Sequence, residues 1–266
     1  MIIRPIFPWL LALALLAQQL AAEAAELDPV KLMQAVQAQA SPRDEAVRME
    51  MKLTDRDGKT SQRTAWYSRK QRFASGNAAM KLIRFDSPAE MAGSGVLTLE
   101  NANRPDDQWL YLPAFHASRK VPSSNRSDRY MGTDFFFEDV SEDKIEAYQY
   151  AMQGYESIDG RRLARIEQLP RDDVLKRDSA YGKKIQWVDP ERLLVARIDY
   201  FDKAGTLIKR FQAAAPAQAA GRWRWKTASM TDLRLNHRTD IVYSERKIDS
   251  GLNEALFTIR QLERGQ

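Results

Sequence analysis

The chain has 266 residues, a formal net charge of +5 and no cysteine. Without cysteine it forms no disulfide and offers no thiolate nucleophile or soft metal ligand, so these classes of site are excluded. The small excess of positive charge, spread along the chain, suits an anionic membrane surface or headgroup as well as ordinary solubility.

The N-terminus has the order of features of a secretory signal peptide. Arg4 supplies the positive region, residues 6–16 are apolar, and small residues surround Ala22 and Ala24. No later stretch approaches the ~20 apolar residues that span a membrane. We therefore expect a signal peptide over residues 1–24, cleaved near residues 22–24, and a single exported domain over residues 25–266. The absence of cysteine also removes the acceptor for a lipoprotein anchor, which favours a free periplasmic protein.

One helix is predicted near the mature N-terminus. Asp28 can cap it, Pro29 fits its first position, and apolar residues recur on one face at positions 30, 33 and 36. Ser41-Pro42 ends it.

Beyond this helix, polarity alternates with period two, which is typical of strands with one dry and one wet face. Asp57-Gly58 marks a hairpin turn, and short strands joined by close turns predict an antiparallel meander. The alanine-rich residues 213–221 are predicted to form a mobile loop. A sheet of about ten strands curls. The predicted fold class is therefore α+β, mostly β: a strongly curved antiparallel half-barrel with a few short helices covering its concave face.

Residues 132–140 contain three consecutive phenylalanines, Phe135, Phe136 and Phe137, between acidic residues. Three adjacent rings cannot share one strand face or helix stripe. The segment either plugs a core from a loop or lines a place for an apolar ligand. We expect Asp134, Glu138 and Asp139 to solubilise it and to start a short helix, rather than to bind calcium. An extended backbone would turn Phe135 and Phe137 inward and Phe136 elsewhere.

Reactive side chains are scarce. The two histidines, His116 and His237, lie far apart in the sequence and form no metal-binding motif. The tetrad 237–240 is predicted to lie on the surface. In residues 223–226, strand geometry puts the tryptophans and the cations on opposite faces, which disfavours nucleic-acid binding. The sequence therefore predicts no catalytic residue, metal site or cofactor, and a non-enzymatic protein; a hydrolase remains a minor alternative.

Aromatic and methionine side chains gather on the faces that we expect to turn inward. Most such residues form a core, but a carrier of acyl chains needs the same walls, because each exposed methylene costs roughly 0.8 kcal/mol in water. The predicted ligand-cavity residues are Val47, Met49, Met51, Leu53, Tyr67, Trp109, Tyr111, Phe135, Phe137, Trp187 and Tyr200.

Four ordered stretches resemble a known family. They are residues 107–113 with 119–121, residues 132–139, residues 184–188 with the hairpin 200–209, and residues 255–263. Together they resemble the LolA-like outer-membrane lipoprotein-sorting proteins, particularly the branch associated with transporters of the resistance–nodulation–division (RND) type.

The resemblance implies a periplasmic carrier that sequesters acyl chains of lipids or lipoproteins for transfer between the inner and outer membrane. The implied partners are an inner-membrane permease of the RND type and an outer-membrane acceptor, with peripheral membrane contact, no nucleic acid and a monomeric state. An envelope-stress sensor or regulatory binding module with the same half-barrel is the alternative from another functional class.

Overall fold

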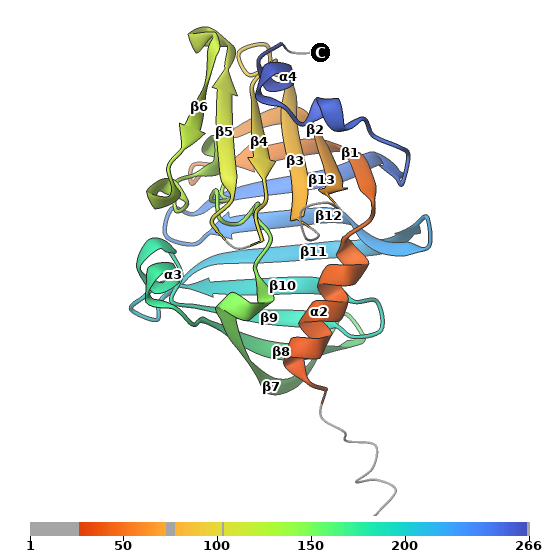
Figure 1. Ribbon diagram of the computed structural model, residues 1–266. Helices are drawn as coiled ribbons and strands as arrows, with labels where there is room; N and C mark the ends of the chain where they lie inside the picture. Colours follow the sequence, from red (N-terminus) through yellow and green to blue (C-terminus); the bar gives the residue numbers. More distant parts are fainter. Residues whose placement is uncertain (1–26, 73–77, 103, 265–266) are drawn as a thin grey trace, which may run out of the picture.

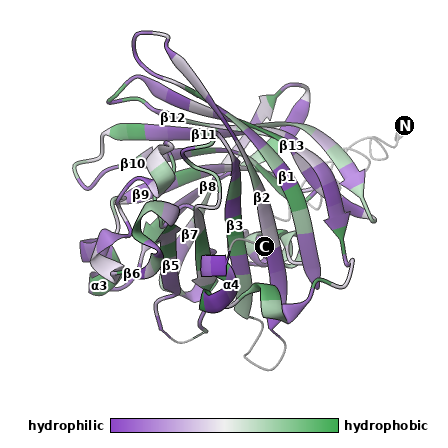
Figure 2. Ribbon diagram, turned by 90° about the horizontal axis from the view of Figure 1, so that it is seen from above, coloured by the Kyte–Doolittle hydropathy of each residue, from purple (hydrophilic) through white to green (hydrophobic). Residues whose placement is uncertain are grey.

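The computed structural model describes residues 27–72, 78–102 and 104–264, so the predicted signal peptide lies outside the described residues. Its strands form one 13-stranded sheet whose paired neighbours all run antiparallel (Figure 1). Seen from above, the sheet curls into a wall on which hydrophobic and hydrophilic residues alternate (Figure 2). The predicted fold class is confirmed, with 13 strands in place of about ten.

The strands are β1 (Asp44–Thr54), β2 (Thr60–Arg72), β3 (Ala78–Ser87), β4 (Gly95–Leu99), β5 (Asp107–Leu112), β6 (Ala117–Val121), β7 (Tyr148–Ile158), β8 (Arg161–Pro170), β9 (Lys183–Asp189), β10 (Leu194–Phe201), β11 (Leu207–Ala219), β12 (Arg222–Asp232) and β13 (His237–Ile248). The α-helices are α2 (Pro29–Ala40), α3 (Asp173–Asp178) and α4 (Ile259–Arg264), and the 3-10 turns are η2 (Pro113–Phe115), η3 (Ser123–Asn125), η4 (Tyr130–Gly132), η5 (Ile145–Ala147) and η6 (Glu254–Leu256).

The N-terminal helix forms where local signals predict it. The carboxylate of Asp28 accepts hydrogen bonds from the backbone N–H groups of Val30 and Lys31, and Pro29 occupies the first turn. The buried face of α2 carries Leu32, Met33 and Val36. This face packs on Ala164, Ile166 and Val188 of the sheet, so α2 covers the concave side near β8 and β9.

The strand order explains how the chain encloses a hollow. Strands β1 to β6 run in chain order from the middle of the sheet to one edge. β7 forms the other edge, and β7 to β13 return to the middle, where β13 pairs with β1. The chain must therefore pass from one edge to the other between Val121 and Tyr148. This connection crosses the same face of the sheet as α2 (Figure 1).

Both faces of the sheet are covered. On the concave face, one cluster gathers Met49, Met51, Leu53 and Phe137, and a second holds Tyr200. On the convex face, Leu262 of α4 packs with Met80, Leu82 and Leu97. The expectation that the helices cover the concave face is therefore correct for α2 but wrong for α4, because β3 and β4 carry apolar residues on both sides.

The alanine-rich stretch is a strand, which corrects the predicted loop. β11 continues through Pro216 to Ala219 and pairs with β12, with Pro216 opposite Trp225. Ala215 has a φ of 54°, and it lies between two paired residues, Ala214 opposite Thr227 and Pro216 opposite Trp225. The register of β11 and β12 is the same on both sides of Ala215, so the hairpin continues past the proline.

Candidate functional site

The connection between the two sheet edges, residues 122–147, forms the cover of the hollow. Its only regular structure is the short 3-10 turns η3, η4 and η5. From residue 128 onward, its contacts divide it into two parts. Residues 128–139, here called the anchor, are deeply seated against the sheet. Residues 140–147, here called the strap, are half-buried over most of their length.

The phenylalanines of the anchor enter two different clusters. Phe137 joins the cluster of β1 to β4 and meets Tyr130 edge-on, with ring centroids 5.2 Å apart. Phe136 stacks on Tyr181, with ring centroids 5.8 Å apart, in the cluster of β10 to β12. Phe135 lies partly buried between the two clusters. The prediction that Phe136 points away is therefore wrong: the chain turns here, so consecutive rings reach different parts of one concave surface.

Asp134 fixes the start of this segment. Its carboxylate is fully buried and accepts hydrogen bonds from the Thr239 hydroxyl (2.7 Å), from Nδ1 of His237 (2.7 Å) and from Arg129 (2.5 Å). The tetrad predicted to be on the surface is thus split by strand alternation. His237 and Thr239 hold Asp134, whereas Arg238 and Asp240 pair with each other in solvent.

Asp139 and Glu138 fix the end of the anchor. Asp139 accepts hydrogen bonds from the Tyr181 hydroxyl (2.9 Å) and from Nζ of Lys209 (3.1 Å). Lys209 is fully buried, and its Nζ lies 3.2 Å from the centroid of the Phe136 ring. Glu138 accepts from the Ser179 hydroxyl (2.7 Å) and from the Ala180 N–H (2.9 Å). These acids are bound by Lys209 of β11 and by residues 179–181, which precede β9, and this corrects the expectation that they solubilise the segment.

The strap is held by two further carboxylates. Asp143 accepts hydrogen bonds from Nζ of Lys184 (2.7 Å), from Gln168 (2.9 Å) and from the Tyr148 hydroxyl (2.9 Å). Burial opposes the charge on Asp143, but these three donors outweigh burial and hold the pKa of its carboxyl below the usual value. Glu142 lies 3.8 Å from Arg69. The strap is therefore held by these electrostatic contacts together with two apolar side chains, Val140 and Ile145, which pack against the clusters of the concave face.

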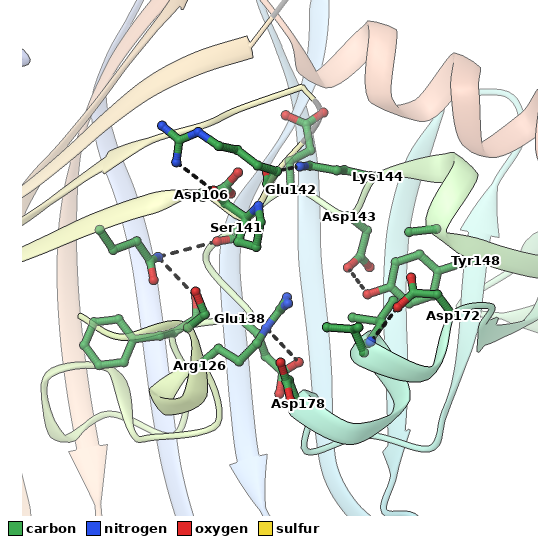
Figure 3. A pocket seen from close by; sticks show the side chains of 18 of the residues that line it. Asp106, Arg126, Glu138, Ser141, Glu142, Asp143, Lys144, Tyr148, Asp172 and Asp178 are labelled. Carbon is green, nitrogen blue, oxygen red and sulfur yellow. Dashed lines mark hydrogen bonds and ion pairs between the residues drawn. The ribbon is translucent and has the colours of Figure 1, made fainter. Parts of the chain in front are cut away.

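Three cavities surround the strap. The inner cavity, about 390 Å³, lies between α2, the strap and the sheet. The edge cavity, about 610 Å³, is lined by residues of β5 to β7 and α3 and is drawn in Figure 3. The helix-end cavity, about 740 Å³, adjoins the C-terminal end of α2. Glu142 and Asp143 line all three, so the strap lies between the three cavities.

The walls of the inner cavity are mixed in character. Met33, Val36 and Ile198 supply apolar surface. Arg69, Lys81 and Lys184 supply positive charge, and Tyr67, Tyr150 and Tyr200 supply aromatic surface with hydroxyl groups. Carboxylates also line this cavity, and most of them are paired with cations or hydrogen-bond donors: Glu45, Glu138, Asp139, Glu142 and Asp143. The buried hydroxyl of Tyr150 has no hydrogen-bond partner among the described residues. The cavity therefore suits a molecule with both a hydrocarbon part and a polar end.

The predicted cavity residues fall on two sides of the sheet. Those on the concave side are Val47, Met49, Met51, Leu53, Tyr67, Phe135, Phe137 and Tyr200. Tyr67 and Tyr200 line the inner cavity, and Phe137 lines the edge cavity. The remaining three, Trp109, Tyr111 and Trp187, lie on the convex side and are separated from this set.

Trp109, Tyr111 and Trp187 are buried because other parts of the chain cover the convex side of the sheet. Trp109 and Tyr111 share a cluster with Phe257 and Leu262 of the C-terminal segment. Trp187 packs with Trp225, and its indole N–H donates to Glu156. Alternation predicts which residues of a strand share a face, but it does not say which face is concave. The sequence also offered no signal for the residues it missed, Lys184 and Lys209, because buried and exposed lysines look alike in an alternating strand.

The buried carboxyl of Glu138 makes a testable contribution to stability. Burial raises its pKa despite the hydrogen bonds from Ala180 and Ser179, and Asp139 adds to the rise. The folded state holds this proton more tightly than the unfolded state does. The contribution of Glu138 to the free energy of unfolding therefore declines as the pH rises from the pKa of the unfolded state through the pKa of the folded state. Glu138→Gln is therefore expected to be more stable than wild type by about 1 kcal/mol at pH 8 and equal to it below about pH 4.

Asp143→Asn is the matched comparison, measured with Glu138→Gln by urea unfolding at several pH values. Its carboxyl has a lowered pKa, so the wild type gains stability above the unfolded pKa and loses it as pH falls through the folded one. Asp143→Asn should be less stable than wild type at pH 8, and the difference should shrink in acid. Shifts of the same sign in both variants would contradict the assigned roles.

Neither a metal site nor a membrane-spanning helix emerges from the part of the chain that the structure describes. Within residues 27–72, 78–102 and 104–264, no three histidine or acidic side chains gather as a metal-binding group, and no helix is long and apolar enough to cross a bilayer.

A family model described as "Uncharacterized protein" matches residues 77–264. The chain belongs to this family. No curated protein matches the sequence. Among solved structures, a domain from Vibrio parahaemolyticus described as an outer membrane lipoprotein-sorting protein is 28% identical, with a TM-score of 0.82, covering 89% of this chain and 98% of its own.

Two further structures extend this comparison. A DUF1329 family protein from Desulfovibrio piger is also 28% identical with a TM-score of 0.82, covering 88% of this chain and 99% of its own. A LolA superfamily protein from Nitrosomonas europaea is 18% identical with a TM-score of 0.65, covering 85% of this chain and 97% of its own, and shares the fold. The resemblance to LolA-like outer-membrane lipoprotein-sorting proteins is thus confirmed, whereas the association with RND-type transporters stays a prediction.

Proposed function

We propose that this protein is a periplasmic carrier that holds acyl chains of a lipid or lipoprotein in the hollow between its curved sheet and the strap. The observation that supports this most directly is the division of the cover. The anchor is built into the core, whereas the half-buried strap separates three cavities that share its residues Glu142 and Asp143. The 28% identical Vibrio domain, named for lipoprotein sorting, points in the same direction.

The mechanism is reversible sequestration without chemical change. Displacement of the strap joins the cavities and opens a path along the concave apolar surface of β1 to β4. Each methylene that leaves water for this surface contributes roughly 0.8 kcal/mol, so a chain of ten carbons or so is retained through diffusion between membranes. Return of the strap closes the hollow over the cargo.

The wider proposal concerns the place of this carrier. The signal peptide over residues 1–24 directs a single carrier domain, residues 25–266, to the periplasm. There it works as a monomer and touches membranes only peripherally. An inner-membrane permease of the RND type hands over the cargo, and an outer-membrane acceptor receives it.

Lipid extraction tests the carrier function. The mature protein, purified from a periplasmic fraction, is expected to release lipid that mass spectrometry detects, and to take up a fluorescent fatty acid. Trp109→Glu is the matched control, because Trp109 lies on the convex side beneath the C-terminal segment. It should load like wild type. The carrier proposal would be contradicted if the purified protein contained no lipid and took up neither a charged nor a neutral acyl probe.

A further inference from the structure

Two cations on the floor of the inner cavity receive their negative partners from the strap. Nζ of Lys184 points from β9 to Asp143 and lies between 5.4 and 5.9 Å from the ring centroids of Tyr148, Tyr181 and Tyr200. Arg69 in β2 is 4% exposed and faces Glu142. Across residues 27–72, 78–102 and 104–264, the carboxylates at ion-pair distance from these two side chains are those of the strap.

Other buried cations of the sheet have permanent partners. Lys81 pairs with Glu100 at 2.5 Å, at the end of β4, and Arg224 in β12 pairs with Glu45 in β1. Moving the strap therefore leaves Lys81 and Arg224 neutralised. The same movement removes the carboxylate partners of Lys184 and Arg69, although Arg69 keeps its hydrogen bonds to the Pro42 carbonyl, the Ser41 hydroxyl and Gln71. A buried charge without a partner is strongly unfavourable, so an open hollow that excludes water needs another anion at this place.

We propose that the ligand is an anionic amphiphile whose acid headgroup replaces Asp143 and Glu142 on Lys184 and Arg69. This inference rests on the proposed carrier function and adds the chemistry of the headgroup. The exchange links binding to opening, because the headgroup takes over the contacts that hold the strap closed. The unpartnered hydroxyl of Tyr150 supplies a further donor at the same cavity.

The chemistry of the donors defines the ligand class. A guanidinium and an ammonium group bind a carboxylate or a phosphate by charge-assisted hydrogen bonds. The hydrocarbon part of the ligand then lies against Met33, Val36 and Ile198, which line the same cavity. A fatty acid and an acidic phospholipid both fit this description, whereas a neutral lipid leaves the two cations without an anionic partner.

A pair of probes isolates the headgroup. A fluorescent fatty acid and its methyl ester carry the same chain and differ in charge. Wild-type protein is expected to bind the acid at least tenfold more tightly than the ester, the scale of one charge-assisted hydrogen bond. Lys184→Gln should weaken acid binding about tenfold and change ester binding less than twofold. Lys183→Gln is the matched control, since Lys183 pairs with Glu167 and lies beside Phe201 of the convex cluster. It should leave both affinities unchanged.

Two more variants keep the test decisive if Lys184→Gln alone folds poorly. Lys184→Gln/Asp143→Asn retains a neutral hydrogen-bonding pair and should lose the preference for the acid while binding the ester like wild type. Asp143→Asn removes the competing carboxylate and should raise acid affinity more than ester affinity. Displacement of the bound probe by vesicles of phosphatidylglycerol, but not of phosphatidylcholine, would identify an acidic phospholipid; displacement by decanoate alone would identify a fatty acid.

The outcomes separate the two proposals. Equal affinity of wild-type protein for acid and ester, or equal loss of both in Lys184→Gln, overturns the headgroup assignment and leaves the carrier function standing. Failure of both probes to bind wild-type protein overturns the carrier function itself.

Discussion

Lys209→Met is expected to lower the free energy of unfolding by roughly 3–5 kcal/mol, the usual effect of breaking a buried ion pair from one side. Lys209 and Asp139 have side chains that are 0% and 1% exposed. Burial lowers the pKa of Lys209, while Asp139 favours its charged form. Removal of the ammonium group leaves the Asp139 carboxylate buried with the Tyr181 hydroxyl as its remaining side-chain donor. Urea unfolding followed by circular dichroism measures the loss.

Two controls define what this loss means. Lys120→Met breaks the pair with Asp107 at a lysine that is 60% exposed, and should cost less than 1 kcal/mol. Lys209→Met/Asp139→Leu removes both charges and should recover part of the stability lost by the single variant. A single variant within 1 kcal/mol of wild type would show that the anchor does not depend on this pair.

Local signals predicted the parts of the fold whose contacts are local. Asp28 and Pro29 specify the start of α2 because the cap and the first turn involve adjacent residues. Asp57-Gly58 specifies the first hairpin, and the alternation of Val47 to Leu53 places these side chains on one buried face of β1. Successive hairpins of this kind predict a curved antiparallel sheet.

The path of the crossing segment depends on information that no local pattern contains. The segment spans the hollow because β6 and β7 form opposite edges, which follows from the pairing of β13 with β1. Its carboxylates are buried because each meets a partner far away in sequence: Asp139 meets Lys209, and Asp134 meets Thr239. Charged residues are almost never fully buried without such partners. A prediction that does not know the distant partner therefore places these residues in solvent.

The sequence also does not specify which face of each strand lies on the concave side. Trp109 and Trp187 are large, apolar and mostly buried, as expected of cavity residues, yet they are covered from the convex side. In a sheet that buries only one face, a large apolar side chain identifies the concave face. This sheet buries both faces, and only the positions of α4 and of the β11–β12 hairpin show which side each tryptophan takes.

Phe137→Ala connects the stability of the anchor with the proposed cargo. Phe137 is 6% exposed, packs against Tyr130 and lines the edge cavity. Its truncation is expected to cost about 3–5 kcal/mol, because it removes apolar contacts and leaves a void. That void adjoins the hollow. An acyl chain can therefore fill it and bind more tightly than to wild type. At one decanoate concentration the ligand should stabilise Phe137→Ala more, by about 2.7 kcal/mol where that concentration is a hundred times the Kd.

Phe136→Ala provides the comparison for this rescue. Phe136 is 5% exposed, so the loss of stability should be similar, but its ring lies between Tyr181 and Lys209 in the other concave cluster. A hydrocarbon chain that replaced it would meet a buried ammonium group. Unfolding with and without decanoate should therefore show a larger gain for Phe137→Ala than for Phe136→Ala or wild type. Equal gains in all three proteins would place the acyl chain away from Phe137 and require a different route through the hollow.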